Sequence, residues 1–402
     1  LDKSFRLLFQ DDDVIAAEKG MDLAEAEKVR KASAAGKEMS RLTPALMTSL
    51  FPAGVTSPEY NADGSVTFRC QAPNATKVEL ECQMFEGTKP MRKDFRSGVW
   101  TITVTPDQPD IYPYCFVIDG TQVADPNNMF IFPNESFKYS LADVRGAVPT
   151  TQDIQNVPHG KVAYRYYFSK ACGIERPMCV YTPAGYDPAG SEKLPVLYLI
   201  HGMTDTYETW FKVGQMNNIM DNLIAKGEEK RMIVVMPYAN PYPEMIAQGK
   251  ASAYNSMDTE LTTKEFIGEV MPFIEANYNV LTDADHRAIA GFSLGGRQTL
   301  AAGFGNPDKF HYVAAYAPAI FGNEYETNFT NGTYKPIAEL KSKLKFMFLG
   351  TGKEDFLLQA STGLDKYLTD QGLKHTFYNP GGGHTWMNCR DYLELTAKEL
   401  FK

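Results

Sequence analysis

The chain has 402 residues, with 40 Lys and Arg against 49 Asp and Glu, so its formal net charge is −9. An acidic chain without a basic tract lacks the clustered cations that nucleic-acid phosphates require, and no apolar run approaches the roughly 18 residues needed to cross a bilayer. The 24 Phe, 22 Tyr and 3 Trp supply ample core material. We expect two or three domains from this length.

The first fifty residues form a polar segment. Residues 14–39 are rich in Ala, Glu and Lys, which predicts one or two helices with a thin apolar face. No signal-peptide pattern is present there. We assign this helical segment, residues 1–50, no chemistry.

Residues 51–144 show short strands separated by turn signals. Strands are predicted at residues 65–70, 77–82, 100–104 and 112–118, and Asp119–Gly120 is a strong hairpin signal before a return strand at 122–123. This spacing, with no helical pattern between the strands, predicts a small immunoglobulin-like β-sandwich. Residues 145–159 follow it as a predicted linker.

The pattern changes again from residue 160 to residue 402. Apolar strands at residues 194–200, 232–236, 287–290 and 344–349 alternate with helical stretches at 214–225, 263–278, 297–304 and 355–371. Such alternation predicts an α/β fold with a doubly wound, mainly parallel sheet covered on both faces. Active sites in these folds lie at the carboxyl ends of the strands.

A nucleophile pattern lies at one of these strand ends. The strand at 287–290 runs into Gly291–Phe292–Ser293–Leu294–Gly295, a G-x-S-x-G sequence that leads directly into a helix. A tight strand-to-helix turn exposes the serine hydroxyl, and the small glycines permit the crowding. We therefore predict Ser293 as a nucleophile; the alternative is a glycine-rich turn that only saves space.

The base and the acid are sought downstream, in the chain order Ser, acid, His. His384 follows a glycine tract beyond the last strand, whereas His311 and His375 have structural interpretations, with His375 pointing outward. Asp355 follows the strand at 344–349 and is favoured over Glu354 as the acid. Its predicted role is to orient and stabilise His384, although it could also cap its helix.

An esterase also needs N–H donors for the developing oxyanion. Leu294, directly after the nucleophile, supplies the first. The strand at 194–200 leads into His201–Gly202–Met203, so Met203 is predicted as the second donor and Gly202 as a substrate-binding position. His201 is expected to brace this loop. Neither a metal nor an organic cofactor is required.

The six cysteines show no C-x-x-C pair, which argues against a zinc cage. Buried free thiols are the expectation for a chain of this length. A disulfide between Cys172 and Cys179 is the alternative.

With these residues in place, residues 160–402 resemble carbohydrate esterase family one, the esterase D-like α/β-hydrolases that include feruloyl and acetyl xylan esterases. The matching pieces are P-V-L-Y-L-I-H-G-M at 195–203, R-A-I-A-G-F-S-L-G-G at 287–296, G-K-E-D-F at 352–356 and G-G-H-T-W at 382–386. Thr204 and Asp205 stand where many relatives carry a glycine-rich stretch. Residues 51–144 resemble the carbohydrate-binding modules of family forty-eight, through V-T-F-R-C-Q-A-P-N-A-T-K-V-E-L at 66–80 and Y-P-Y-C-F-V-I-D-G at 112–120.

The combined resemblance implies a secreted, periplasmic or cell-surface serine esterase acting on plant cell-wall polysaccharide, with feruloyl esters on arabinoxylan as the main hypothesis. Trp210 and Trp386 lie near the catalytic loops in sequence and are candidates to stack on a sugar or phenolic ring, the alternative being core packing. Three rival functions remain: an acetyl xylan esterase, an acyltransferase to a sugar acceptor, and a carbohydrate-binding scaffold without catalysis. Xylan, arabinoxylan or a feruloylated oligosaccharide is the expected partner, and the oligomeric state stays open.

Overall fold

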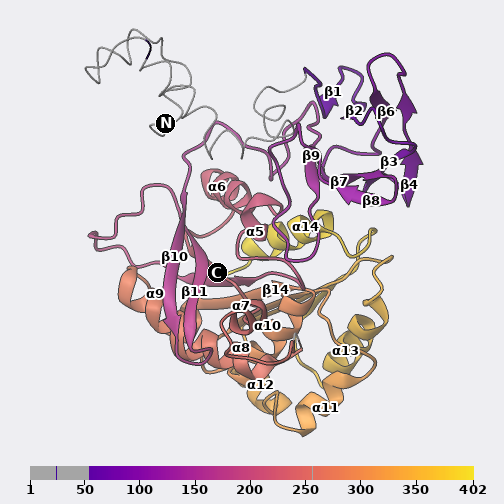
Figure 1. Cartoon of the computed structure of the whole chain (residues 1–402). Helices are drawn as coiled ribbons and strands as arrows, with labels where there is room; N and C mark the ends of the chain where they lie inside the picture. Colours follow the sequence, from indigo (N-terminus) through magenta and orange to yellow (C-terminus); the bar gives the residue numbers. More distant parts are fainter. Residues whose placement is uncertain (1–23, 25–53, 256) are drawn as a thin grey trace.

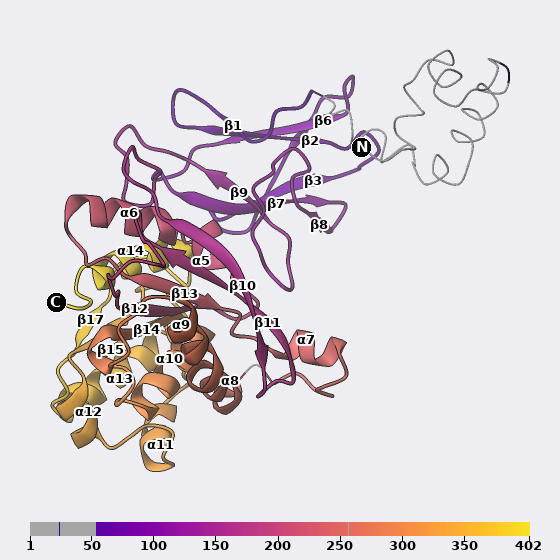
Figure 2. The same ribbon diagram turned by 90° about the vertical axis from the view of Figure 1, so that its left-hand side faces the viewer.

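The computed structural model describes Ala24, residues 54–255 and residues 257–402 (Figure 1). The helical segment predicted for residues 1–50 lies outside these ranges apart from Ala24. Two regions follow one another along the described chain (Figure 2). We call residues 59–143 the two-sheet region and residues 161–397 the α/β region.

The two-sheet region contains one sheet with strand order β1-β2-β6-β5 and another with order β4-β3-β7-β8, to which β9 adds by pairing with β7. Its strands are β1 (Glu59–Tyr60), β2 (Val66–Gln71), β3 (Val78–Cys82), β4 (Thr88–Pro90), β5 (Arg92–Lys93), β6 (Val99–Val104), β7 (Ile111–Ile118), β8 (Thr121–Val123) and β9 (Ser140–Asp143). Alternate side chains of both sheets point inward and meet in one cluster, which includes Phe68, Leu80 and Tyr114. The predicted strands are all present.

The α/β region is built on an eight-stranded sheet with strand order β10-β11-β13-β12-β14-β15-β16-β17. Its strands are β10 (Lys161–Ser169), β11 (Ile174–Thr182), β12 (Val196–Ile200), β13 (Ile233–Pro237), β14 (Arg287–Phe292), β15 (Tyr312–Tyr316), β16 (Phe346–Gly350) and β17 (Thr376–Tyr378). The pairs β10–β11 and β11–β13 are antiparallel, and the other pairs are parallel. The predicted α/β class is confirmed.

Helices cover both faces of this sheet (Figure 2). They are α5 (Thr209–Lys212), α6 (Met216–Lys226), α7 (Tyr242–Ala247), α8 (Thr259–Glu265), the π-helical turn η2 (Phe266–Val270), α9 (Met271–Asn277), the 3-10 turn η3 (Ala284–His286), α10 (Leu294–Gly305), α11 (Glu324–Thr330), α12 (Ile337–Lys343), α13 (Leu358–Asp370) and α14 (Trp386–Ala397). On one face α5, α6 and α14 pack against Leu197 and Leu199 of β12. On the other face α9 to α13 pack against Val196, Tyr198 and Ile200 of the same strand, as the alternation of strand side chains requires.

Two of the differences from the sequence prediction concern a covering helix and the edge of the large sheet. The single helix predicted over residues 263–278 is α8, η2 and α9 in succession, because the backbone forms a π-helical turn at Phe266–Val270. The antiparallel hairpin β10–β11 was not predicted. Seven of the nine residues of the edge strand β10 are exposed or half-buried, so this strand lacks the continuous apolar run that marks the central strands.

The two regions share hydrophobic core. Ile111, Phe132 and Leu141 of the two-sheet region belong to the cluster that α5, α6 and α14 enclose. In the opposite direction, Met387 of α14 packs against the cluster between the two sheets. The segment predicted as a linker also packs on the α/β region, since Asn222 of α6 donates to the carbonyls of Thr151 and Asp153, both at 2.8 Å.

All six cysteines lie in the described part of the chain, where each is buried and free. The alternative disulfide between Cys172 and Cys179 is therefore absent. Among the described helices, none is long and apolar enough to cross a membrane.

Candidate active site

Ser293 lies at the tight turn between β14 and α10. Its φ of 57° and ψ of −115° place it in a strained conformation for a residue with a side chain. The glycines around it have no room for a Cβ. A Cβ added to Gly291 would lie 2.4 Å from the Gly295 carbonyl oxygen, and one added to Gly295 would lie 2.4 Å from the His201 carbonyl oxygen. The turn therefore requires glycine on both sides of the serine, and it leaves Ser293 at the start of a helix.

His384 and Asp355 come together in two neighbouring loops at the same edge of the sheet. Asp355 follows β16, and His384 lies between β17 and α14. His384 Nδ1 and Asp355 Oδ2 are 2.8 Å apart, and Asp355 Oδ1 accepts the Leu357 N–H at 2.8 Å. The carboxylate is 5% exposed, so it orients the ring from a protected position and also caps the turn that follows.

The His384 ring lies beside the nucleophile turn. Its centroid is 4.5 Å from that of Phe292, the residue before Ser293. Since Nδ1 is bound to Asp355, Nε2 is the ring atom that can serve the serine. No hydrogen bond joins Ser293 Oγ to His384 within residues 54–255 and 257–402, and in substrate-free enzymes this bond commonly tightens only when substrate binds.

The loop after β12 approaches Ser293 from the other side. A Cβ added to Gly202 would lie 3.5 Å from Ser293 Cβ, which brings the His201–Met203 segment and the N-terminus of α10 to the same place. Leu294 is the first residue of α10, so its N–H has no partner within the helix. The two predicted donors thus lie on segments that flank the serine.

His201 is fixed by two hydrogen bonds. Nε2 accepts the Ala239 N–H at 3.0 Å, so Nδ1 carries the proton and donates to the Gly202 carbonyl oxygen at 2.8 Å. Burial lowers the pKa of His201 to about 4, which keeps the ring neutral at pH 7. It acts on the loop as expected, through hydrogen bonding.

The other candidates lie apart from this group. His311 binds Asp285 at 2.6 Å, and His375 binds Asp365 at 2.9 Å. The expectation that His375 points outward is wrong, because its side chain is only 5% exposed and turns toward α13. Glu354 is exposed.

The prediction that Trp210 and Trp386 contact substrate is also wrong. They are 1% and 5% exposed, and their rings pack edge to face with centroids 4.8 Å apart. With both faces inside the core that joins α5 and α14, neither ring is open to a sugar. Their proximity in sequence to the catalytic loops reflects core packing beneath those loops.

Three residues near the site were given no role by sequence analysis. Phe356 is 73% exposed, and its ring centroid is 4.6 Å from that of His384; its place directly after Asp355 was the available signal. Asp205, 5% exposed, lies beside Gly202. Asn134 reaches Asp205 from the two-sheet region, and no local pattern marks it.

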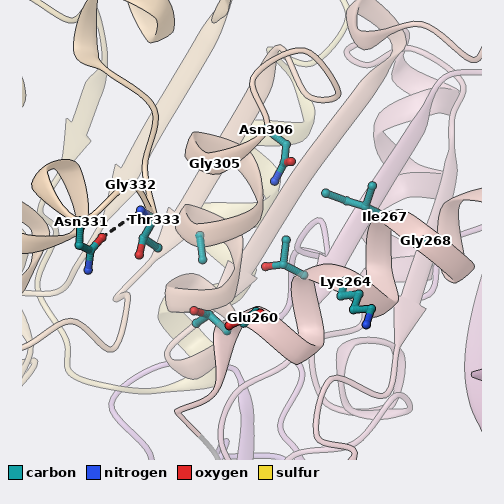
Figure 3. A pocket seen from close by; sticks show the side chains of 12 residues that line it. Glu260, Lys264, Ile267, Gly268, Gly305, Asn306, Asn331, Gly332 and Thr333 are labelled. Carbon is teal, nitrogen blue, oxygen red and sulfur yellow. Dashed lines mark hydrogen bonds between the residues drawn. The ribbon is translucent and has the colours of Figure 1, made fainter. Parts of the chain in front are cut away.

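A separate cavity of about 710 Å³ lies at the far end of α10. Figure 3 shows the side chains of Glu260, Lys264 and Asn306 around it. None of its lining residues belongs to the group around Ser293. In the described part of the chain, no cluster of three His, Cys, Asp or Glu side chains is arranged to hold a metal ion.

Comparison with known proteins places the chain among esterases. A protein of Xylanibacter ruminicola named endo-1,4-beta-xylanase/feruloyl esterase is 30% identical over 370 residues, which cover 87% of this chain and 46% of that protein. The chain therefore spans less than half the length of this relative. A solved ferulic acid esterase is 28% identical with a TM-score of 0.52, over 60% of this chain and 98% of its own.

Similarity in fold alone extends across both regions. The enterobactin esterase FES of Shigella flexneri is 16% identical with a TM-score of 0.65, and the match covers 89% of this chain and 98% of that one. The resemblance to carbohydrate esterase family one is confirmed by these relatives and by the family match. Residues 169–390, more than half of the chain, match the family described as putative esterase, so the chain belongs to this esterase family and is a carboxylic ester hydrolase.

Proposed function

We propose that the chain is a serine esterase that releases ferulate from arabinoxylan or a related plant cell-wall polysaccharide. The observation that carries the mechanism is the 2.8 Å hydrogen bond between His384 Nδ1 and Asp355 Oδ2, in loops that border the strained turn at Ser293. The relative named endo-1,4-beta-xylanase/feruloyl esterase supports the substrate class. Such a substrate lies outside the cell, so we also propose a secreted, periplasmic or cell-surface location.

The reaction proceeds in two halves. Ser293 Oγ attacks the ester carbonyl carbon while His384 Nε2 takes its proton, and the N–H groups of Met203 and Leu294 stabilise the oxyanion. The intermediate collapses, and the sugar hydroxyl leaves with the proton from His384. A water molecule then gives a proton to His384 and attacks the acyl-serine. This second intermediate collapses to ferulic acid, and Ser293 Oγ takes the proton back from His384.

An aromatic acyl group is favoured by the apolar surface beside the base. Phe356 exposes 73% of its surface next to His384, and Met203 exposes 44% at the oxyanion loop. A phenolic ring that covers exposed apolar side chains of this kind removes them from water, which stabilises the enzyme–substrate complex. An acetyl group is too small to cover this surface, so acetyl xylan is the second candidate.

The test is a turnover screen of the full chain with methyl ferulate, a feruloylated arabino-oligosaccharide, acetylated xylan and p-nitrophenyl acetate. We expect the highest kcat/KM on the feruloylated oligosaccharide, with free ferulic acid as the product. Faster turnover of acetylated xylan would replace the feruloyl assignment with the acetyl one. A sugar ester as the main product would indicate acyl transfer, and a Ser293→Ala variant with unchanged turnover would refute the mechanism.

A further inference from the structure

The peptide group between Gly202 and Met203 presents one of the two proposed oxyanion donors. A trans peptide directs its C=O and N–H to opposite sides, so whatever holds the Gly202 carbonyl also aims the Met203 N–H. Two groups bind that oxygen: the His201 Nδ1–H at 2.8 Å and the Asp205 N–H at 3.3 Å. The direction of the donor therefore depends on where Asp205 sits.

The loop cannot keep this shape through its own sequence. Thr204 has a φ of 63°, a left-handed conformation that β-branched residues adopt only when neighbouring structure holds them there. Asp205 carries a carboxyl group that is 5% exposed, and an unpaired buried carboxylate is unfavourable. Burial raises the pKa of Asp205 to about 7. Both residues need partners outside the loop.

The partners come from the two-sheet region. Asn134 Nδ2 donates to Thr204 Oγ1 at 3.1 Å and to Asp205 Oδ1 at 3.2 Å. Its backbone forms an isolated antiparallel β-bridge with Asp205, and the Glu135 N–H donates to the Thr204 carbonyl at 2.7 Å. Asn134 thus binds both the strained residue and the buried carboxyl, and Glu135 adds a second bond to the strained residue.

Asn134 is itself held in place. It is 6% exposed, and its Oδ1 accepts the Ser136 N–H at 2.9 Å and the Phe137 N–H at 3.2 Å. These bonds point its NH₂ group toward the loop. The next side chain, Glu135, accepts from Asn240 Nδ2 at 2.9 Å through both carboxylate oxygens, so the segment is tied to the α/β region on a second side.

We propose that Asn134 is a positioning residue for ester hydrolysis: its amide holds the Gly202–Asp205 loop so that the Met203 N–H is aimed at the oxyanion. The two-sheet region is then a part of the active-site structure and not a detachable module. This inference rests on the proposed serine esterase mechanism. It assigns Asn134 no contact with the substrate, so its loss acts on the transition state through the loop.

The experiment compares Asn134→Ala and Asn134→Asp with wild type in the full chain, on p-nitrophenyl acetate and methyl ferulate. Rates are divided by the concentration of active sites that a fluorophosphonate probe titrates at long exposure, so that a smaller folded fraction does not count as slower catalysis. We expect kcat to fall about 10–100-fold with KM within about threefold, because a misaligned oxyanion donor weakens only the transition state. The rate of fluorophosphonate labelling should fall in parallel.

The matched control is Asn128→Ala. Asn128 is a buried amide in the same segment, but it binds Tyr114 and the Leu141 carbonyl within the two-sheet region. This variant should lose thermal stability and keep its kcat per active site. The inference is overturned if Asn134→Ala keeps the wild-type kcat per active site. It is also overturned if Asn128→Ala loses as much kcat per active site as Asn134→Ala. A wild-type protein that hydrolyses no ester would refute the proposed function instead.

Discussion

Arg390 of α14 forms a buried ion pair with Asp110 of the two-sheet region. The two side chains are 1% and 10% exposed, and the Arg390 guanidinium also donates to the Val213 carbonyl at 2.7 Å. α14 begins two residues after His384. The ion pair therefore holds in place α14, the helix that directly follows the proposed base His384. Asn134 contacts the loop after β12, on the opposite side of Ser293.

Removing one partner of this pair should destabilise the fold. Asp110→Asn leaves the Arg390 cation buried without its counter-charge, and such changes typically cost about 3–5 kcal/mol. Urea unfolding followed by fluorescence measures the free energy of unfolding. Lys366→Ala breaks an ion pair whose side chains are 75% and 58% exposed, and this control should cost less than about 1 kcal/mol. Similar losses in both variants would mean that the buried pair contributes no more than a surface one.

The proposed acid partner of His384 can be tested by substituting two neighbours. Asp355→Asn keeps the size of the side chain but loses the charge that stabilises the His384 imidazolium, and kcat should fall about 10³–10⁴-fold. Glu354→Gln removes the exposed neighbouring carboxylate and should leave kcat within about twofold. Steady-state hydrolysis of p-nitrophenyl acetate measures both. A greater loss in Glu354→Gln would reverse the assignment.

The parts of the site that sequence analysis could predict are those encoded locally. Ser293 is marked by its glycines between a strand and a helix, and His384 by its place after the last strand. Asn134 could not be predicted, because its partner Thr204 is 70 residues away and belongs to the other region. Trp210 was misassigned because proximity in sequence to a predicted catalytic loop does not show whether the core buries the ring.

The same limit applies to the fold. The central strands are continuous apolar runs because both faces of the sheet are buried, so the α/β class followed from their sequence alone. The docking of the two regions could not be predicted from the sequence, because Ile111 and Met387 look like ordinary core residues until their partners are known. Both contribute to clusters that span the two regions.

Glycine at position 295 should be essential for the nucleophile turn. In Gly295→Ala the new Cβ would lie 2.4 Å and 2.6 Å from the carbonyl oxygens of His201 and Ile200, which are backbone atoms that cannot move aside without displacing the oxyanion loop. We expect loss of turnover and a lower Tm. Gly268→Ala is the control, since nothing lies within 4 Å of its added Cβ, and helical Ala should be neutral or stabilising by about 0.5–1 kcal/mol. A fully active Gly295→Ala would contradict the packing of the turn.

Phe356 should distinguish aromatic from small acyl groups. Phe356→Ala removes the exposed ring beside His384, so KM for methyl ferulate should rise about 5–20-fold, corresponding to about 1–2 kcal/mol of lost apolar contact. KM for p-nitrophenyl acetate, whose acetyl group is too small to cover this ring, should change less than about twofold. Phe95→Ala removes a ring that is 88% exposed in the two-sheet region and should alter neither value. Equal effects on both esters would exclude Phe356 as an acyl contact.

The stability of the protein should carry a pH dependence that originates at Asp205. Its pKa is raised from 3.8 to about 7, first by burial and further by the nearby Glu135 carboxylate, although the Asn134 amide opposes this shift. Below about pH 4 the group is protonated in both the folded and the unfolded chain, so it costs nothing. Between about pH 4 and pH 7 the unfolded chain has lost the proton and the folded chain retains it, so the free energy of unfolding falls as pH rises. Above about pH 7 the full cost remains, on the order of 4 kcal/mol.

Asp205→Asn should remove this cost, because the amide oxygen at position 205 can still accept from Asn134 without a charge. The variant's gain in the free energy of unfolding over wild type should therefore grow from pH 4.5 to pH 7.5 and then level off, as measured by urea unfolding at each pH. Asp63→Asn serves as the control: hydrogen bonds from Ser65 lower the pKa of the exposed Asp63, so its difference from wild type should be flat above about pH 5. A gain for Asp205→Asn that does not change with pH would mean that the carboxyl group at position 205 is not held protonated by the fold.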